Sequence, residues 1–308
     1  MSKNSKNILQ RESLVKALGF PAGTKVLMIT CDEFGELHAS NMGVIEAMEG
    51  GLGIRKYAVG ATMQMPSPWA PEAIAYARSH PEADIGVHLV IENGYLNMKW
   101  RPICSKAEVP GLYSPEGYFW GSAKEAWAHS NEKEIYKECR AQIEMALRLG
   151  LDVTHLDGHM DFQWANRAGY CRVVGELAQE FRLPFRQQSR LRYEESGAEK
   201  LRDEVLSRGI ISPDEDTEAL LKKPNESWKE LYLRRLREFS PGLTDIYVHP
   251  ALDSEEIRGL ECISPKKAES RVEQYQLVVH DPDFREAIKR PDMRIVGWRD
   301  IRNLQRSL

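Results

Sequence analysis

Short apolar segments take turns with segments of helical spacing along most of this chain, and that alternation limits the possible folds more than any other feature. Residues 25–35 (KVLMITCDEFG) have the pattern of a buried strand, and residues 40–51 (SNMGVIEAMEGG) that of a helix stopped by glycines. Strands that alternate with helices form mainly parallel sheets, closed or nearly closed. We therefore predict an α/β fold of the β/α-barrel type, in which active sites lie at the C-terminal ends of the strands.

The same alternation assigns the remaining elements. Strands are expected over residues 57–65, 84–91, 152–157, 242–252 and 293–301, and helices over residues 71–83, 133–151 and 172–183. Residues 92–122 are rich in Gly, Pro and aromatic side chains and are expected to be irregular. The predicted organisation is an N-terminal helical arm over residues 1–24 and a single barrel domain over residues 25–308, with a charged helical insertion near residues 194–240.

Acidic residues and histidines stand where the predicted strands end. Asp32 and Glu33 end the first strand, His88 lies near the end of the third, and His249 ends a later one. Residues 153–163 (VTHLDGHMDFQ) add two histidines and two aspartates. Each of these residues alone has an ordinary explanation, as a helix cap, a core histidine bonded to backbone or a strand end. Their joint occurrence at four strand ends indicates an active site at one rim of the barrel.

Composition excludes several classes of partner and location. A formal net charge of -4 with 29% charged residues argues against nucleic acid as the main partner, because phosphate binding requires a basic surface. No run approaches the roughly 18 apolar residues of a membrane helix, and the N-terminus lacks an apolar signal-peptide core. The cysteines are odd in number and form no C-x-x-C pair, so we expect a cytoplasmic protein with reduced thiols at Cys31, Cys104, Cys139, Cys171 and Cys262.

Several segments resemble the landmarks of the YdjC-like carbohydrate deacetylases, the family of chitooligosaccharide deacetylase. They are CDEFG (31–35), GVHLVIENG (86–94), THLDGH (154–159), YVHPA (247–251) and IVGWRD (295–300), and they occur in order over nearly the whole chain. The resemblance implies a distorted TIM-like (β/α) barrel that uses a divalent metal ion, Zn or Mg, to hydrolyse an acetamido group on a sugar. It also implies a homodimer.

The resemblance assigns roles to the residues at the strand ends. Family members bind the metal ion through the second acidic residue of a D-D pair and two histidines, which correspond here to Glu33, His88 and His159. The first acidic residue, Asp32, would then act as the general base, and His249 would orient the substrate or protonate the leaving amine. A carboxylate and two imidazoles suit a hydrolytic metal ion that keeps positions open for water and substrate.

Other residues receive roles from their positions. Asp157 is expected to support a histidine ligand, Asp161 to face the substrate entrance, and His155, one strand step deeper, to be structural. Trp100 and Trp120 lie in the irregular segment and are candidates for stacking on a sugar ring, although loop anchoring is the more common role of such side chains.

The chain differs from the family pattern at Glu33, where aspartate is usual, and after His159, where MDFQ replaces a histidine-rich tail. The second difference indicates a separate branch and a different sugar. The predicted function is a metal-dependent hydrolase that removes an acetyl group from an N-acetylated sugar or a related amide. Two alternatives stay open. One is another metal-dependent barrel enzyme, such as a sugar isomerase or a hydrolase of a different C–N bond, and the other is a sugar-binding homologue that has lost turnover.

Overall fold

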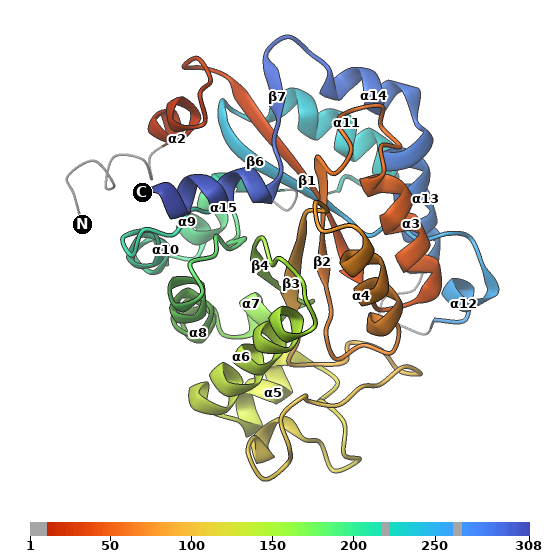
Figure 1. Cartoon of the computed structure of the whole chain (residues 1–308), viewed down its shortest axis with the longest axis vertical. Coiled ribbons are helices and arrows are strands. Elements are labelled where there is room, and N and C mark those ends of the chain that lie inside the picture. Colours follow the sequence, from red (N-terminus) through yellow and green to blue (C-terminus); the bar gives the residue numbers. More distant parts are fainter. Residues whose placement is uncertain (1–10, 217–221, 261–266) are drawn as a thin grey trace.

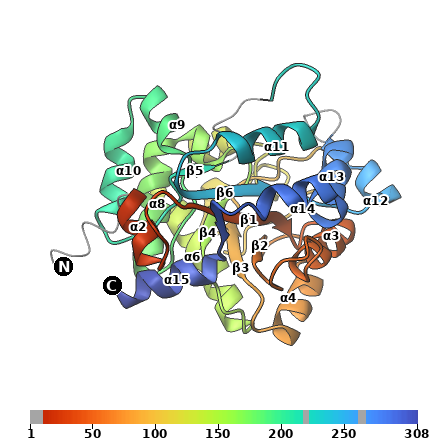
Figure 2. The same cartoon turned by 90° about the horizontal axis from the view of Figure 1, so that it is seen from above.

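A parallel β-sheet forms the centre of the protein in the computed structural model, which describes residues 11–216, 222–260 and 267–308 (Figures 1 and 2). Its strands are β1 (Lys25–Phe34), β2 (Val59–Met63), β3 (Ile85–Leu89), β4 (Leu156–Gly158), β5 (Glu215–Asp216), β6 (Gly242–Val248) and β7 (Met293–Ile295). They are hydrogen-bonded in the order β4-β3-β2-β1-β6-β5, with β7 beside β1, and every ladder is parallel. Within the described residues no ladder joins β4 to β5, so the sheet curls into an incomplete, distorted barrel. The predicted α/β barrel fold is confirmed.

Helices surround this sheet (Figure 1). The longer ones are α3 (His38–Met48), α4 (Ala70–Ser79), α6 (Glu132–Arg148), α8 (Arg167–Glu180), α11 (Trp228–Glu238) and α15 (Trp298–Ser307). The shorter ones are α2 (Arg11–Ala17), α5 (Ala123–His129), α7 (Phe162–Ala165), α9 (Arg190–Glu195), α10 (Glu199–Leu206), α12 (Glu255–Arg258), α13 (Lys267–Tyr275) and α14 (Pro282–Ile288), with a 3-10 turn η1 (Pro110–Leu112) and a π-helical turn η3 (Gln276–His280). Local chemistry sets their bounds. The Asn131 side chain caps α6 by accepting two amide hydrogen bonds, and Gly150, at φ +93°, allows the chain to leave it.

The strand β1 is central because it pairs along both of its edges. β6 runs beside one edge from Lys25 to Cys31. Since β6 takes that whole edge, β2 and β7 share the other, β7 along residues 25–27 and β2 from Ile29 onward. The acidic residues at the end of β1 therefore lie in the middle of the sheet.

The side chains of β1 alternate between the surrounding helices and the barrel interior. Residues 27, 29 and 31 belong to the main apolar core together with side chains of α3. Val26 and Met28 point the other way, into a second apolar cluster inside the barrel. Thr30 and Asp32 continue this inward face. The barrel interior thus changes from apolar at the N-terminal ends of the strands to polar at their C-terminal ends, and this gradient places the site.

The strand expected over residues 293–301 is wrong beyond Ile295. The structure ends β7 there and begins α15 at Trp298. The Gly297 amide donates to the Asp300 carboxylate at 2.9 Å, which favours a helix start at this point. Trp298 is nevertheless buried, and its indole N–H donates to Thr30 Oγ1 at 2.9 Å inside the barrel. The apolar residues at the start of α15 continue the apolar pattern of β7, and for this reason the sequence pattern predicts a longer strand than the structure has.

The division into an arm and one barrel domain stays a prediction. Within residues 1–24, Arg11–Ala17 form α2, and residues 1–10 lie outside the described residues. The region near residues 194–240 contains α10 and α11, while residues 217–221 lie outside the described residues.

The cysteines that the structure describes are buried free thiols, Cys31, Cys104, Cys139 and Cys171. Cys262 lies outside the described residues. In the described part of the chain, every helix is too short or too polar to cross a membrane.

Candidate functional site

A cavity of about 700 Å³ opens at the C-terminal ends of the strands. Asp32, Glu33, His88 and Arg186 form its buried floor, and its walls include Asp161, Trp164, Trp228, Tyr247 and His249. The volume lies within the range of about 300–1,000 Å³ that is usual for small-molecule sites. The predicted rim of the barrel therefore contains a cavity large enough for a small ligand.

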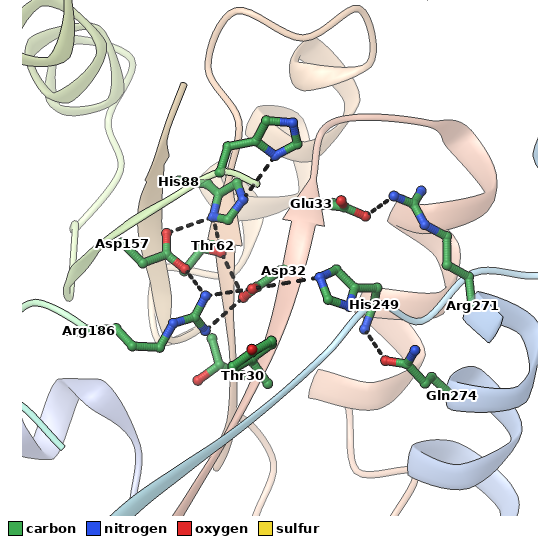
Figure 3. Close-up of polar contacts among 12 residues, drawn as sticks. Thr30, Asp32, Glu33, Thr62, His88, Asp157, Arg186, His249, Arg271 and Gln274 are labelled. Carbon is green, nitrogen blue, oxygen red and sulfur yellow. Dashed lines mark hydrogen bonds and ion pairs between the residues drawn. The ribbon is translucent and has the colours of Figure 1, made fainter. Parts of the chain in front are cut away.

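Arg186, on the floor of this cavity, joins three buried aspartates, of which Figure 3 labels Asp32 and Asp157. Its Nη2 atom lies 2.5 Å from Asp32 Oδ2 and 2.5 Å from Asp157 Oδ2, and its Nη1 atom lies 3.3 Å from Asp245 Oδ2. The side chain points inward because Phe185, next to it, bridges in parallel to Leu156 of β4. Burial lowers the pKa of Arg186, but the charges of the three aspartates outweigh burial and raise it, so this guanidinium stays charged.

Asp245, on β6, differs from the other two aspartates. Its Oδ1 atom accepts a hydrogen bond of 2.7 Å from the Thr30 hydroxyl. Burial raises the pKa of Asp245 to about 7, against the opposing charge of Arg186. This carboxyl group is therefore close to half protonated at neutral pH, which relieves part of the negative charge around Arg186.

His88 is oriented by Asp157 of the neighbouring strand β4. Its Nδ1 atom lies 2.7 Å from Asp157 Oδ1 and 3.2 Å from the Thr62 hydroxyl. Burial lowers the pKa of His88, but the charge of Asp157 and their hydrogen bond outweigh burial and raise it. Its other nitrogen, Nε2, lies 3.3 Å from His159 Nδ1. A metal-binding histidine usually donates one ring N–H to a carboxylate and binds the ion through its other, unprotonated nitrogen. The contact between His88 Nδ1 and Asp157 matches the first half of this arrangement.

A second buried cluster surrounds Arg271 of α13. The guanidinium forms ion pairs with Glu33 and Glu36, the latter at 2.6 Å, and donates to the Tyr95 hydroxyl at 2.6 Å. Glu33 has a φ of +67°, which is rare for a residue with a side chain and is typical of functional sites. Gln64 connects the cluster to the histidines, since its Nε2 atom lies 3.2 Å from His159 Nδ1.

His249 follows β6 and faces Asp32 across the cavity. Its Nε2 atom lies 4.0 Å from Asp32 Oδ2 (Figure 3). The His249 amide donates to Gln274 Oε1 at 2.9 Å, and the same oxygen lies 3.3 Å from the Tyr232 hydroxyl. α13 thus supplies both Gln274, which holds the backbone of His249, and Arg271, which holds Glu33.

Among the residues that the structure describes, two groups could hold a metal ion. Asp32, His88 and Asp157 make up the Asp32 group, and Glu33, Glu36 and His159 make up the Glu33 group; within each, one ligand atom of every residue lies within 4.8 Å of the others. When all are ionised, the buried carboxylates Asp32, Glu33, Glu36, Asp157 and Asp245 exceed the buried guanidiniums Arg186 and Arg271 by three negative charges. Buried charge requires compensation, so this donor set fits a divalent cation.

The structure divides the predicted metal ligands between the two groups. His88 belongs to the Asp32 group, whereas Glu33 and His159 belong to the Glu33 group, and the two imidazoles connect them. Asp32 and His249, the predicted catalytic residues, face the cavity together. The assignment of these five roles stays a prediction. His155 lies one layer deeper, where it stacks on the Trp298 ring at 4.3 Å between centroids.

The predicted sugar-stacking residues lie apart from the described lining of the cavity. Trp100 is 3% exposed and packs 6.0 Å from the His159 ring, behind the site. Trp120 stacks on His129 at 3.9 Å and donates to a backbone carbonyl. The tryptophans that line the cavity are Trp164 and Trp228, which were not selected from the sequence. Asp161 does line the cavity.

Arg186, Arg271, Glu36 and Asp245 were also missed. A signal existed for Arg186, since PFR follows a predicted helix as a strand would, and for Asp245, which alternates with Leu243 and Tyr247 along a predicted strand. No sequence signal pointed to Arg271, because it comes from a segment of mixed charge that looks like a solvated helix.

Comparisons with known proteins give the family of this chain and a similar fold. The sequence model of the YdjC-like protein family matches residues 26–290. A carbohydrate deacetylase of Geobacillus stearothermophilus is 31% identical over 159 residues, which are 52% of this chain and 58% of that protein, less than two thirds of its length. One of Thermoanaerobacter pseudethanolicus is 24% identical over 250 residues, 80% of this chain and 89% of that protein. A crystal structure from Enterococcus faecalis V583, described as a candidate cellobiose-phosphate cleavage protein, has a TM-score of 0.72 and 25% identity, and covers 90% of this chain and 99% of that one.

Proposed function

The chain belongs to the YdjC-like protein family, and from this premise we propose that it is a metal-dependent hydrolase that removes an acetyl group from an N-acetylated sugar or a related amide. The names of the relatives support the reaction. The observation in this chain that carries the proposal is the buried set of carboxylates and imidazoles at the strand ends, of which Asp32, Glu33 and His88 line a cavity. Such a set is unfavourable for packing alone, because each group must be desolvated.

The metal ion, Zn or Mg, is proposed to bind at His88 and His159, with Glu33 as the carboxylate ligand. The two imidazole nitrogens that approach each other at 3.3 Å support this position. Asp157 would keep the second nitrogen of His88 engaged and so fix the ring. When bound, a divalent ion supplies a Lewis acid for the amide carbonyl and an activated water.

Asp32 is proposed as the general base and His249 as the acid for the leaving amine. Both line the cavity, and their polar atoms lie 4.0 Å apart, so one bound amide can be within reach of both. Arg186 and Thr62 hold the Asp32 carboxylate in place through hydrogen bonds of 3.0 and 3.2 Å to Oδ1.

The sugar is proposed to stack on the tryptophans of the cavity wall. Trp164 and Trp228 lie in the lining, and sugar rings present apolar faces that pack on aromatic rings. Asp161 lies in the same wall and would accept hydrogen bonds from sugar hydroxyls. Trp100 and Trp120 would support the site from behind by packing.

Location and assembly are part of the proposal. Buried free thiols at the described cysteines support a cytoplasmic protein. A homodimer is proposed from the family resemblance, and sedimentation of the purified protein tests it.

Acetate release tests the function. The purified protein is incubated with Zn²⁺ or Mg²⁺ and a panel of N-acetylated amino sugars, and acetate and bound metal are measured together. Wild type should release acetate, and His88→Ala should lose both metal and acetate. Bound metal without acetate would favour an isomerase or a hydrolase of another C–N bond. Sugar affinity without metal would favour a sugar-binding homologue.

A further inference from the structure

We propose that Arg271 and Glu36 together set the metal affinity of this chain. Arg271 competes with the metal ion for Glu33, and Glu36 keeps the guanidinium neutralised when Glu33 turns to the ion. The inference rests on the metal dependence in the proposed function, but it does not depend on the substrate.

The first support is the position of Arg271 between two carboxylates. The Arg271 side chain is 1% exposed and contacts Glu33 through Nη2 (Figure 3). Its Nη1 atom contacts Glu36 at 2.6 Å. A guanidinium buried this deeply is strongly unfavourable unless a carboxylate remains beside it. Glu33 can therefore leave Arg271 at low cost only if a second carboxylate stays.

The second support is that the two carboxylates differ in access. Glu33 ends β1 and lines the cavity, whereas Glu36 is fully buried and is absent from the described lining. Gln64 Nε2 lies 3.4 Å from Glu36 Oε1 and 3.2 Å from His159 Nδ1, which fixes Glu36 from its other side. Glu33 is thus suited to change partners, and Glu36 to stay.

The third support is the short path between the two partners of Glu33. Ligand atoms of Glu33, Glu36 and His159 lie within 4.8 Å of one another. A rotation of the Glu33 side chain is enough to bring its carboxylate from Arg271 to an ion at His159. The Glu33 side chain has one methylene more than an aspartate would have, and the added torsion makes this exchange possible.

The test measures Zn²⁺ affinity of the full chain by competition with a chromophoric chelator, after removal of bound metal. Glu36→Gln should bind Zn²⁺ about 10–100-fold more weakly than wild type, the range seen when a partner of a ligand is lost. Arg271→Met should bind at least about 10-fold more tightly, because the ion then provides the positive charge that Glu33 and Glu36 need. In the Arg271→Met background, Glu36→Gln should lose most of its effect on affinity.

The double-mutant comparison separates this role from others. If Glu36→Gln weakens Zn²⁺ binding equally with and without Arg271, Glu36 is itself a ligand and the proposal is overturned. If Glu36→Gln leaves affinity unchanged, its role is structural and the proposal is again overturned. Should Arg271→Met fail to fold, Arg271→Lys replaces it. A single ammonium contacts both carboxylates poorly, so the effect of Glu36→Gln should shrink in that background as well.

Glu138→Gln is the matched control. Glu138 is equally buried, but it accepts hydrogen bonds of 2.9 Å from the amides of Ile103 and Cys104, away from the cavity lining. The Glu138→Gln substitution should lower the free energy of unfolding and leave Zn²⁺ affinity unchanged. Acetate release is measured separately. If wild type releases no acetate but the variants show the predicted Zn²⁺ affinities, the deacetylase activity is refuted and this inference stands. If wild type releases acetate but the variants bind Zn²⁺ with the affinity of wild type, this inference is refuted and the deacetylase activity stands.

Discussion

Replacing Arg186 by methionine should destabilise the protein strongly and in a pH-dependent way. The guanidinium is the shared cation of Asp32, Asp157 and Asp245, each of which is at most 3% exposed. Methionine keeps much of the volume of the side chain but provides no charge and no N–H donor. Three buried carboxylates would then share the barrel interior without a cation.

The size of the loss follows from the charges left behind. Removing one partner of a buried ion pair costs about 3–5 kcal/mol. We expect this range at pH 7 rather than three times as much, because Asp245, with a pKa of about 7, is already partly protonated there. Burial raises the pKa of Asp157, and the charges of His88 and Arg186 outweigh burial and lower it, so without Arg186 the pKa of Asp157 should rise. Each pKa unit corresponds to about 1.4 kcal/mol, and the cost is relieved as pH falls and the carboxylates take up protons.

Urea unfolding of metal-free protein, followed by tryptophan fluorescence between pH 5 and 8, measures this loss. The gap between wild type and Arg186→Met should be largest at pH 8 and should fall by at least half at pH 5. Arg302→Met is the control. Arg302 is similarly buried, but its partner Asp152 has a side chain that is 49% exposed and can regain water. A gap for Arg186→Met below about 1 kcal/mol, or one that does not change with pH, would refute the charge argument.

Three further outcomes test the site. Asp32→Asn should keep its metal and lose roughly two to four orders of magnitude in turnover, the usual scale for a general base; turnover near wild type would remove Asp32 from that role. Trp164→Ala should raise KM for the sugar with little change in unfolding, whereas Trp100→Ala should cost about 3–5 kcal/mol of stability, and the reverse pattern in KM and urea titrations would contradict the placement of the two rings. Burial raises the pKa of Asp245 to about 7, so its contribution to stability is present at low pH and is lost between about pH 4 and 7. Asp245→Asn should therefore gain stability relative to wild type as pH rises through this window, and a constant difference in urea titrations would show that the carboxyl group is not protonated in the folded protein.

The sequence was sufficient to predict which side chains lie close together, because parallel strands end at one rim. Asp32, His88 and Asp157 each stand at the end of a strand with a clear apolar pattern, so their convergence follows from the fold. Their individual partners do not follow. Arg271 reaches Glu36 across 235 positions, and no periodic pattern relates two such distant segments.

The tryptophans show a second limit. Trp100 and Trp164 both stand in polar segments rich in aromatic residues, and their local sequence does not distinguish them. Trp100 is 3% exposed and Trp164 36% exposed, a difference decided by packing between distant segments. Sequence patterns predict which strand ends carry chemistry, but the choice of which ring faces a cavity depends on tertiary contacts.

The central position of β1 has a consequence for how the chain reaches its fold during synthesis. β1 is made early, yet the edge that β6 covers stays open until residues 242–248 have left the ribosome. Thr30 bonds to Asp245 and to Trp298, which follow it by 215 and 268 positions. Contacts across such separations form slowly, because the chain loses the entropy of closing a long loop before the contacts stabilise it. An apolar strand with an open edge is meanwhile prone to pair with other chains. The same strand that places Asp32 and Glu33 at the middle of the sheet therefore leaves an unpaired apolar edge in the nascent chain until β6 is made.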